Sequence, residues 1–500
     1  MNATVQETDD VIIIGSGLGG LLCGAILSKE GMKVRVLEKN SEPGGCLQSF
    51  RFHGTLFDTG LHYVGSFLPD QPLYRYWNYP GLSGNLRMER MNGDGFDRIC
   101  LGDREYSLAQ GMDNFRDQLL ASFPGEPEAL NRYIRTLTEA VKAFPMYNLE
   151  LPDGHPEEAY RSMGALDFYR SLGTQDLLRE VLSGNQFLYG GLTDTTPFHI
   201  PALINHSFIS SAFRLSGGSR QIIELLSDKI SSAGGSVGVG QEVVQVNREK
   251  NGFSCTTANH NKFISEILIA DIHPVNLINI TDPSLFTPAF RHRVSGLKNT
   301  VSSFTLYLSL KENSFPYLDY NVHYYSGKGT AGASVAEGRG WPAHFMLYTP
   351  APRTEAGFAG SLVVMTWMKE EETAAWKDTR TGDRGDSYSR FKQERSEKLL
   401  DLVARKFPRI RESIACMTAA TPLTWRDYTG TPGGSLYGLE KDWHDPTRSL
   451  ILPRTRVPGL YFTGQNTNLH GALGVTLGAY LTCGEILGLE YLIKKVRDAD

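Results

Sequence analysis

The sequence predicts an α/β fold in which a Rossmann-like domain, discontinuous in sequence, is combined with a second α+β domain built on a mixed sheet. An apolar run near the N-terminus leads into a glycine-rich turn and a helix, which is typical of a βαβ unit. A strand, a turn and an apolar helix return near the C-terminus. We therefore expect the first domain to comprise residues 1–75, 205–285 and 451–500, and the second to comprise 76–204 and 286–450.

The first βαβ unit is the clearest element. Residues 11–14 are expected to form a strand, 21–29 a helix and 33–37 a second strand that ends at an acidic residue. Glycines at G-x-G-x-x-G spacing allow a tight turn, close approach of a pyrophosphate to the backbone, and close packing of helix on strand. The helix N-terminus directs unpaired N–H groups at phosphates. The dinucleotide-binding residues expected here are Gly15, Gly17, Leu18, Gly19, Gly20, Glu38 and Lys39, with Glu38 accepting a hydrogen bond from a ribose hydroxyl.

The chain between residues 68 and 190 does not continue the βαβ pattern. Residues 68–110 are expected to form short strands and turns. Residues 113–144 have a helical pattern that breaks once, at Phe123-Pro124-Gly125, and residues 157–190 form another helical region.

Periodic elements resume after Gly217-Gly218. Residues 221–235 place apolar side chains at helical spacing, with Ser219 as the expected N-cap. Three strands of a small meander are then expected at residues 243–247, 253–257 and 266–270.

The second domain and the C-terminal end follow. Residues 304–310 and 362–368 are expected to be strands, and residues 388–406 an amphipathic helix. Residues 459–464 are expected to form a strand and a turn, followed by an apolar helix over residues 472–487.

Composition excludes several classes of protein. The net charge is −5 and no Lys/Arg-rich run stands out, which argues against a nucleic-acid partner. The six cysteines form no CxxC pair and no Cys/His cluster with metal-ligand spacing, so we expect no metal site and a reducing compartment, the cytoplasm. Residues 11–27 are uncharged but contain five glycines and are shorter than a membrane span of about 20 residues. With a mean hydropathy of −0.26, at most peripheral membrane association is expected, and the oligomeric state stays open.

Three further glycine turns favour FAD over a nicotinamide dinucleotide. Pro43-Gly44-Gly45 lies just beyond the ribose-binding acid, where a flavin could run its ribityl chain along the backbone. Asp58-Thr59-Gly60 forms a polar turn, and Thr463-Gly464-Gln465 precedes the last apolar helix, whose N-terminus can stabilise a reduced flavin. The expected FAD site is completed by Gly44, Gly45, Cys46, Val243, Val244, Gly464, Gln465, Gly474 and Val475.

These motifs carry a resemblance to a known family. The segments GSGLGG, LEKNSEPGGC, FDTGLHYVG, LSGGSRQ and YFTGQNTNLHGALGVTLGAYLTCGEIL resemble the carotenoid desaturase and isomerase superfamily of flavoproteins. GLHYVG, the TGQ turn and FRDQLLASFPGEPEALNRYIRTL resemble its all-trans-retinol 13,14-reductase (retinol saturase) branch. The resemblance covers nearly the whole chain and implies non-covalent FAD, a long unsaturated lipid as substrate, and a tunnel between the flavin and the second domain.

The resemblance implies an FAD-dependent oxidoreductase that saturates or desaturates a carbon–carbon double bond of a hydrophobic polyene, with NAD(P)H as a candidate reductant. A redox-neutral cis–trans isomerase is the first alternative. A non-enzymatic, flavin-bound escort for a hydrophobic ligand or a prenylated protein is the second. We expect the region from about 76 to 200, together with 285–450, to form a hydrophobic substrate tunnel that ends at the flavin. This expectation rests on the resemblance and on the aromatic segments Tyr74–Tyr79 and Phe198–Phe213.

The candidate catalytic residues are His62, Tyr63 and His470, because they adjoin the expected flavin turns and can transfer or orient a proton. Cys46 is interpreted as a small residue packed against the cofactor rather than a reactive thiol. His199 and His206 are interpreted as core histidines with satisfied polar atoms.

Overall fold

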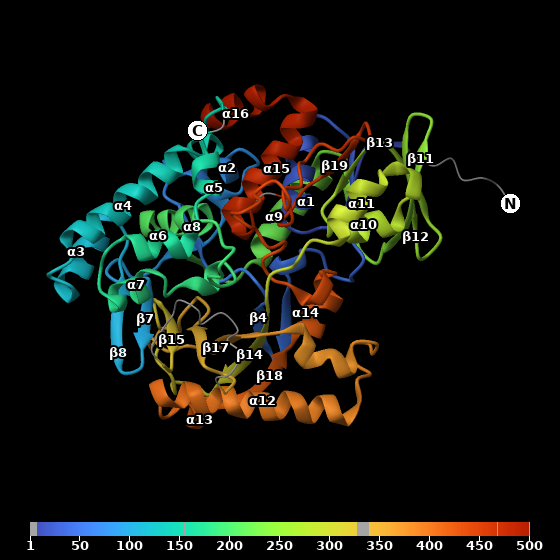
Figure 1. Cartoon of the computed structure of the whole chain (residues 1–500). Coiled ribbons are helices and arrows are strands. Elements are labelled where there is room, and N and C mark those ends of the chain that lie inside the picture. The colour runs from blue at the N-terminus through green and yellow to red at the C-terminus, as the bar shows by residue number, and fades with distance from the viewer. Residues whose placement is uncertain (1–7, 155, 328–339, 468, 500) are drawn as a thin grey trace.

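The computed structural model describes residues 8–154, 156–327, 340–467 and 469–499. These residues form two seven-stranded sheets and two smaller ones, with helices packed around them (Figure 1). The prediction of an α/β fold with a second, mixed sheet is confirmed.

The first large sheet contains the expected βαβ unit, β1 (Thr8–Ile14), α1 (Leu18–Lys29) and β2 (Val34–Leu37). Its strand order is β10-β2-β1-β13-β12-β11, and β19 also pairs with β13. The strands β10, β2, β1, β13 and β19 run parallel, whereas β11, β12 and β13 form the expected antiparallel meander. The remaining bounds are β10 (Ser236–Gly238), β11 (Val243–Glu249), β12 (Gly252–Thr257), β13 (Lys262–Ala270) and β19 (Leu460–Phe462).

Strand β1 is buried on both faces, which explains its continuous apolar run. On one face, Val11 and Ile13 pack with the helices α1, α9 and α15. On the other face, Ile12 and Ile14 pack with residues of α10 and α11. These helices and their neighbours are α2 (Pro72–Asn78), α9 (Arg220–Ser232), α10 (Pro274–Ile280), α11 (Pro288–Ser295), α15 (Gly471–Leu487) and α16 (Leu489–Arg497).

Two sequence expectations for this region need correction. Ser219 is the N-cap residue of α9, but its side chain makes no capping bond, because Oγ donates to the Leu47 carbonyl (2.8 Å) and to Asp58 (3.0 Å). Residues 68–110 are not only strands and turns, because Pro72–Asn78 forms α2, with Pro72 in the first helical turn.

The second large sheet has the order β18-β14-β17-β16-β15-β7-β8. It is antiparallel except for the parallel pair β15 and β7. Figure 1 shows α12 (Gly385–Lys406) running beneath this sheet, and its apolar side chains pack on the lower face. The strands are β7 (Asp97–Leu101), β8 (Arg104–Leu108), β14 (Ser302–Leu310), β15 (Asn321–Tyr325), β16 (His344–Tyr348), β17 (Ser361–Met368) and β18 (Ile414–Ala420).

Helices cover the opposite face of the second sheet. The break expected at Phe123-Pro124-Gly125 is confirmed, since it separates α3 (Met112–Ser122) from α4 (Pro127–Lys142). The expected helical region over 157–190 consists of short helices. These and the following long helix are α5 (Glu158–Arg161), α6 (Ala165–Ser171), α7 (Asp176–Leu182) and α8 (His199–Ser210).

Two small sheets connect the large ones. The hairpin β3 (Ser49–Phe52) and β4 (Thr55–Asp58) follows the first glycine turns, and β5 (Val64–Gly65), β9 (Ala212–Leu215) and β6 (Met88–Arg90) form a three-stranded sheet. The domain boundaries at 75, 204, 285 and 450 stay a prediction.

The remaining helices are α13 (Ile410–Ser413), α14 (Pro422–Thr429) and the 3₁₀ turns Gly45–Leu47, Ser83–Asn85, Pro145–Asn148, Gln186–Leu188, Pro283–Leu285, Glu370–Trp376 and Pro432–Gly434.

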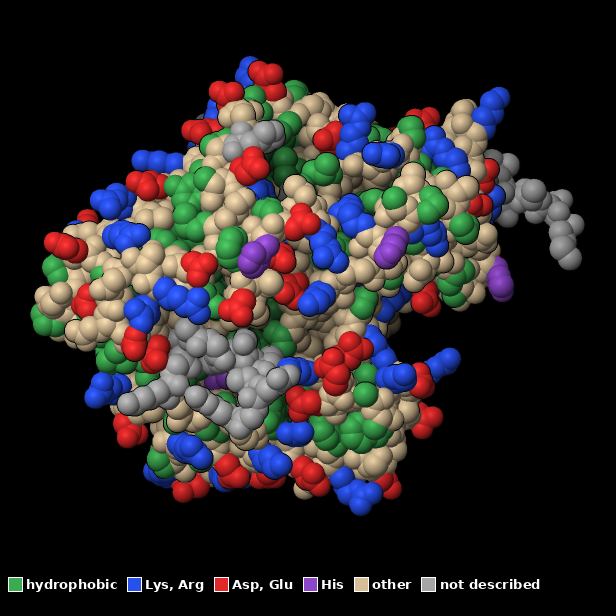
Figure 2. All heavy atoms as spheres, viewed as in Figure 1, with side chains coloured by type: hydrophobic (Ala, Val, Ile, Leu, Met, Phe, Trp, Pro, Cys, Tyr) green, Lys and Arg blue, Asp and Glu red, His purple; other side chains and the backbone are tan. Residues whose placement is uncertain are grey.

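Within the part of the chain that the structure describes, no helix combines the length and the apolar character needed to cross a bilayer. On the face drawn in Figure 2, acidic and basic side chains are interspersed.

Candidate functional site

A central cavity of about 550 Å³ lies where the two large sheets meet. Its wall includes the carboxyl ends of β1 and β2, the first turn of α15, side chains of α8, and Met346 and Met365 from the second sheet. In α/β sheets, ligands bind at the carboxyl ends of parallel strands. The cavity is therefore placed to hold a dinucleotide at one end and a second ligand at the other.

The turn between β1 and α1 forms one wall of the cavity, mainly from backbone. Gly15, Gly17, Leu18 and Gly19 line the cavity, whereas Gly20 does not. Instead, a Cβ at Gly20 would clash with the Gly15 carbonyl, so this glycine permits close packing of helix on strand. A Cβ at Gly19 would lie 2.9 Å from the Gly464 Cα, so the first and last glycine turns of the cavity touch.

Glu38 lies at the end of β2 with only 5% of its surface exposed. Its Oε2 accepts hydrogen bonds from the Ser16 backbone N–H (3.1 Å) and hydroxyl (2.5 Å), and its Oε1 accepts one from the Asn40 N–H (2.9 Å). The carboxylate is thus held rigidly at the cavity wall. Each oxygen can accept more than one hydrogen bond, so this arrangement leaves room for ribose hydroxyls.

Lys39 also lines the cavity, but its ammonium donates to the Asp427 carbonyl (2.8 Å) at the end of α14. Two amides bind the same helix end: Asn40 donates to the Tyr428 carbonyl (2.8 Å) and Asn276 to the Gly430 carbonyl (2.6 Å). The carbonyls of a helix C-terminus lack intrahelical partners, and a cation there is stabilising. Lys39 therefore joins α14 to the first sheet.

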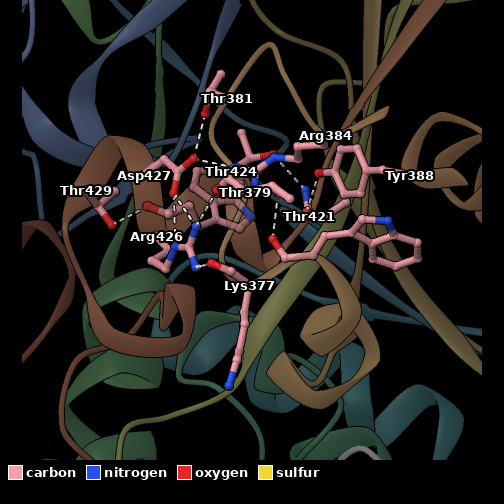
Figure 3. Close-up of polar contacts among 12 residues, drawn as sticks. Lys377, Thr379, Thr381, Arg384, Tyr388, Thr421, Thr424, Arg426, Asp427 and Thr429 are labelled. Atoms are coloured by element: carbon pink, nitrogen blue, oxygen red, sulfur yellow. Dashed lines mark hydrogen bonds and ion pairs between the residues drawn. The ribbon is translucent and has the colours of Figure 1, made fainter. Parts of the chain in front are cut away.

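Figure 3 shows how α14 is held from its other side. Asp427 forms an ion pair with Arg384 and accepts a hydrogen bond from the Thr381 hydroxyl (2.6 Å). Arg426 donates to the Lys377 carbonyl (2.5 Å). Because α14 contributes Trp425, Tyr428 and Thr429 to the cavity wall, this polar cluster fixes one side of the cavity.

Asp271, directly after β13, was not singled out in the sequence. Its carboxylate lies against the dinucleotide turn: a Cβ at Gly17 would be 2.6 Å from Oδ2, and a Cβ at Gly19 would be 2.8 Å from Oδ1. Oδ2 has no hydrogen-bond partner of regular geometry among the described residues. Burial raises the pKa of Asp271 to about 7, assisted by the charge of Glu38 and opposed by the nearby Gly17 and Gly20 N–H groups. Only its position at a strand end could have indicated it.

The two valines expected in the cofactor site differ in burial and in their position relative to the cavity. Val243, at the start of β11, is buried and lines the cavity. Val244 is 45% exposed and does not line it. Neighbouring strand residues point to opposite faces of the sheet, so a pair of adjacent valines cannot both face the ligand. The expectation for the Val244 side chain is therefore corrected.

The remaining glycine turns gather at the middle of the cavity. Gly44, Gly45, Gly464 and Gly474 all line it, as do Cys46, Gln465 and Val475. Gly464 has a φ of +88°, and a Cβ there would clash with Asp271 Oδ1. Burial and the charge of Asp271 raise the pKa of Cys46 to about 11, so this side chain is a neutral thiol at pH 7.

The two candidate catalytic histidines line the cavity and are uncharged at neutral pH. The ring of His62 lies 4.2 Å from that of Tyr348, and its Nδ1 has no partner among the described residues. Burial and the charge of Arg214 lower the pKa of His62 to about 3. Burial lowers the pKa of His470 to about 4, and its Nε2 lies 3.3 Å from the Leu188 carbonyl.

Tyr63 also lines the cavity, with its hydroxyl directed into the second sheet. The hydroxyl donates to Asp97 (2.9 Å), which also accepts a hydrogen bond from Asn321 (2.9 Å). Asn321 in turn accepts one from Arg214 (2.7 Å). Burial and Asp97 raise the pKa of Tyr63 well above its usual value, so it is a neutral phenol that anchors the cavity wall.

The far end of the cavity is apolar. Helix α8 contributes Ile200, Leu203 and Phe208, as expected for the segment Phe198–Phe213. The other aromatic segment, Tyr74–Tyr79, does not line the cavity. Its side chains pack against α15, where the Trp77 Nε1 donates to the Thr476 hydroxyl (2.9 Å), so this segment gives the expected tunnel no support.

The two histidines of α8 differ in their hydrogen bonding. His206 Nδ1 lies 3.2 Å from the Tyr147 hydroxyl, as expected of a satisfied core histidine. His199 is 3% exposed, and neither of its ring nitrogens has a hydrogen bond of regular geometry among the described residues, although the Tyr160 backbone lies close enough to affect its pKa.

The residues of the central cavity fit FAD. Gly44, Gly45, Gly464 and Gly474 line the stretch between Glu38 and α15, and a Cβ at Gly464 or Gly474 would clash with neighbouring protein atoms, so backbone is presented to a ligand there. The buried Asn466 Oδ1 lines this stretch without a partner among the described residues, as expected of an atom that accepts a bond from a ligand.

Comparisons with known proteins agree with this reading of the cavity. An all-trans-retinol 13,14-reductase from Danio rerio is 27% identical over 97% of this chain and 86% of the relative. A phytoene desaturase (neurosporene-forming) from Rhodobacter capsulatus is 22% identical over 95% of this chain and 93% of the relative. The resemblance inferred from the motifs is confirmed.

Among solved structures, cyclohexylamine oxidase from Brevibacterium oxydans superimposes with a TM-score of 0.63 at 15% identity, covering 98% of this chain and all of that one. At this identity the similarity concerns the fold. Residues 18–486 match the family model described as flavin containing amine oxidoreductase. The chain therefore belongs to the flavin containing amine oxidoreductase family and is a flavin-dependent oxidoreductase.

Proposed function

We propose that this protein is an FAD-dependent oxidoreductase that adds hydrogen to, or removes it from, a carbon–carbon double bond in a hydrophobic polyene. The observation that carries the proposal is the central cavity itself. One continuous cavity joins a glycine-lined dinucleotide end to an apolar end formed by α8, Met346 and Met365. The similarity to retinol reductases and carotenoid desaturases supports a polyene as substrate.

Bound FAD supplies hydride transfer, and the protein contributes binding, orientation and exclusion of water. Gly15–Gly19 and Glu38 would hold the adenosine and pyrophosphate, and Gly45, Gly464 and Gly474 the flavin end. The apolar side chains of α8 align an extended chain and keep water from it.

Saturation of a double bond also needs a proton at the second carbon. His62 lines the cavity, and its Nδ1 has no hydrogen-bond partner among the described residues. With a pKa near 3 the ring is neutral at pH 7, so it can orient the substrate or a proton-carrying water by a hydrogen bond, and the proton itself comes from that water.

Anaerobic titration tests this function. The purified, flavin-loaded protein is reduced with dithionite or NAD(P)H and mixed with all-trans-retinol or phytoene. Reoxidation of the reduced flavin together with a product heavier by two hydrogens supports saturation. Reduction of the oxidised flavin, in a second sample without reductant, together with a product lighter by two hydrogens supports desaturation. Rearranged product with no change in flavin oxidation state would identify the isomerase, and binding without any conversion the escort protein.

NAD(P)H as the reductant and peripheral membrane association stay predictions. Omitting dithionite in the same titration tests the first. Flotation of the protein with liposomes tests the second.

A further inference from the structure

A second, small cavity lies apart from the central one. Its volume is about 10 Å³, and three basic side chains line it, Arg161 at the end of α5, His199 at the start of α8, and Lys441. A cavity of this size holds about one water molecule or one ligand oxygen. Three basic groups around so small a space favour the binding of an anion.

The charges around this cavity are poorly compensated. Lys441 donates to the Ser449 carbonyl (3.1 Å) and the Thr467 carbonyl (3.0 Å), and no carboxylate contacts it among the described residues. Burial and the charge of Arg161 lower the pKa of Lys441 to about 7. Lys441 is half-buried, so its ammonium has lost part of its hydration without gaining a counter-ion, and a bound anion would offset that loss.

His199 points to the same conclusion. The sequence predicts a satisfied core histidine here, but neither ring nitrogen has a hydrogen bond of regular geometry among the described residues, apart from a backbone contact with Tyr160 that favours the charged form. Burial, Arg161 and Lys441 together hold its pKa well below the usual range. Buried polar atoms without a protein partner are rare, and they are expected where a ligand is bound.

Two acidic groups, Asp442 and Glu157, lie near the basic residues and compensate their charge only in part. Asp442 also lines the cavity, but its carboxylate accepts hydrogen bonds from the His444 backbone N–H (2.9 Å) and from His444 Nδ1 (2.8 Å). Glu157 favours the charged form of Arg161, but burial has the larger effect on that pKa and lowers it.

A single apolar layer separates the small cavity from the central one. The Phe144 ring lies 5.2 Å from the Arg161 guanidinium and 5.5 Å from the His199 ring, to which it is nearly parallel. Phe144 packs in one cluster with Tyr147 and Leu203, and both of these line the central cavity.

We propose that Arg161, His199 and Lys441 form a carboxylate-binding pocket. A carboxylate oxygen matches the size of the pocket, and a guanidinium, an imidazole and an ammonium are donors suited to it. The carboxylate comes either from the head group of a long unsaturated acid whose chain reaches the central cavity, or from a free small acid. The first source rests on the proposed function, and the pocket itself does not.

Binding measurements on the flavin-loaded protein test the pocket without turnover. Oleic acid and oleyl alcohol differ only in the head group, and acetate represents a free carboxylate. We expect oleate to bind roughly 10-fold or more tightly than the alcohol, since hydrogen bonds to charged groups contribute about 1.5–3 kcal/mol. Lys441→Met and His199→Phe should abolish this preference and leave alcohol binding unchanged. Lys142→Met, at an exposed position of α4, is the matched control.

The outcomes separate the two sources. If the wild type binds oleate more tightly than the alcohol and Lys441→Met does not, the pocket is assigned to a substrate head group. Thermal stabilisation by acetate that disappears in the same variant, without oleate preference, assigns it to a free carboxylate. Equal binding of oleate and alcohol together with no effect of acetate, or a preference that survives in Lys441→Met and His199→Phe, overturns the pocket. Flavin reduction plays no part in these readouts, so a failure of the proposed reaction is seen separately.

Discussion

The two ends of the central cavity are built in different ways. The dinucleotide end consists mainly of glycine backbone from the β1–α1 turn and the two later glycine turns, with Glu38 as its principal side chain. The polyene end consists of side chains from α8, β16 and β17, which are far apart in sequence. A wall made of backbone cannot accept an added Cβ, whereas a wall made of side chains tolerates exchange at constant volume. Substitutions should therefore have their largest effects on FAD retention at the first end.

Replacing Glu38 should have the largest effect on FAD retention. Glu38→Arg removes a carboxylate that is fixed by Ser16 and Asn40 and puts a long cation in its place. Charged hydrogen bonds of this kind contribute about 1.5–3 kcal/mol, and the bulk of arginine adds to the loss, so the variant should be purified without flavin. Flavin content after gel filtration measures the effect. Glu42→Arg, at an exposed position, is the control; full flavin content in Glu38→Arg would show that Glu38 is not at the ribose.

Gly474→Leu should have the second-largest effect on FAD retention. A Cβ at Gly474 would lie 2.6 Å from Leu469 Cβ and 2.9 Å from its carbonyl carbon, so the larger side chain must displace the turn before α15. We expect weaker FAD binding and a lower flavin reduction potential, because the positive end of the helix moves from the ring. Gly471→Asn is the control, since nothing lies within 4 Å of a Cβ there and asparagine tolerates its φ of +76°. Equal potentials in both variants would contradict a flavin contact at this helix end.

Asp271→Asn should have a moderate, pH-dependent effect. The pKa of Asp271 is raised from 3.8 to about 7, so its contribution to stability is fully present below about pH 3.8 and is lost progressively as the pH rises to about 7. Above pH 7 the carboxylate should also repel the pyrophosphate. The variant should therefore bind FAD more tightly and unfold at a higher temperature than the wild type at pH 8.5, and match its FAD affinity near pH 4.5.

The FAD dissociation constant and the melting temperature across this pH range measure the Asp271 effect. Other titratable groups near the turn are Glu38, Cys46 and His273, and all three are retained in the variant. Parallel pH profiles of wild type and variant would rule out Asp271 as the titrating group.

His62→Phe and His470→Phe should change FAD retention least. Both rings belong to the wall beyond the glycine turns, so we expect slower turnover with little change in the FAD dissociation constant. Because burial lowers the pKa of His62 to about 3 and that of His470 to about 4, the wild-type rate should show no histidine inflection between pH 5 and 8. Wild-type turnover in both variants would assign proton transfer to water or to another group, and an inflection near 6.5 would contradict the burial of both rings.

The sequence by itself determined the βαβ unit, the meander, the break between α3 and α4, and the glycine turns with Glu38. These features depend on local φ/ψ preferences and on the period of apolar residues, which are written within short windows of the chain. The family resemblance followed from the same motifs.

Only the tertiary structure decided which side chains share the cavity. Tyr74–Tyr79 and Phe198–Phe213 are both aromatic, yet one segment packs against α15 and the other lines the cavity. Asp271 faces the dinucleotide turn, and His199 joins Arg161 and Lys441, through contacts between residues far apart in sequence. Local pattern fixes the backbone of an element, but burial, the neighbours of a side chain and its pKa exist only after remote elements have packed together.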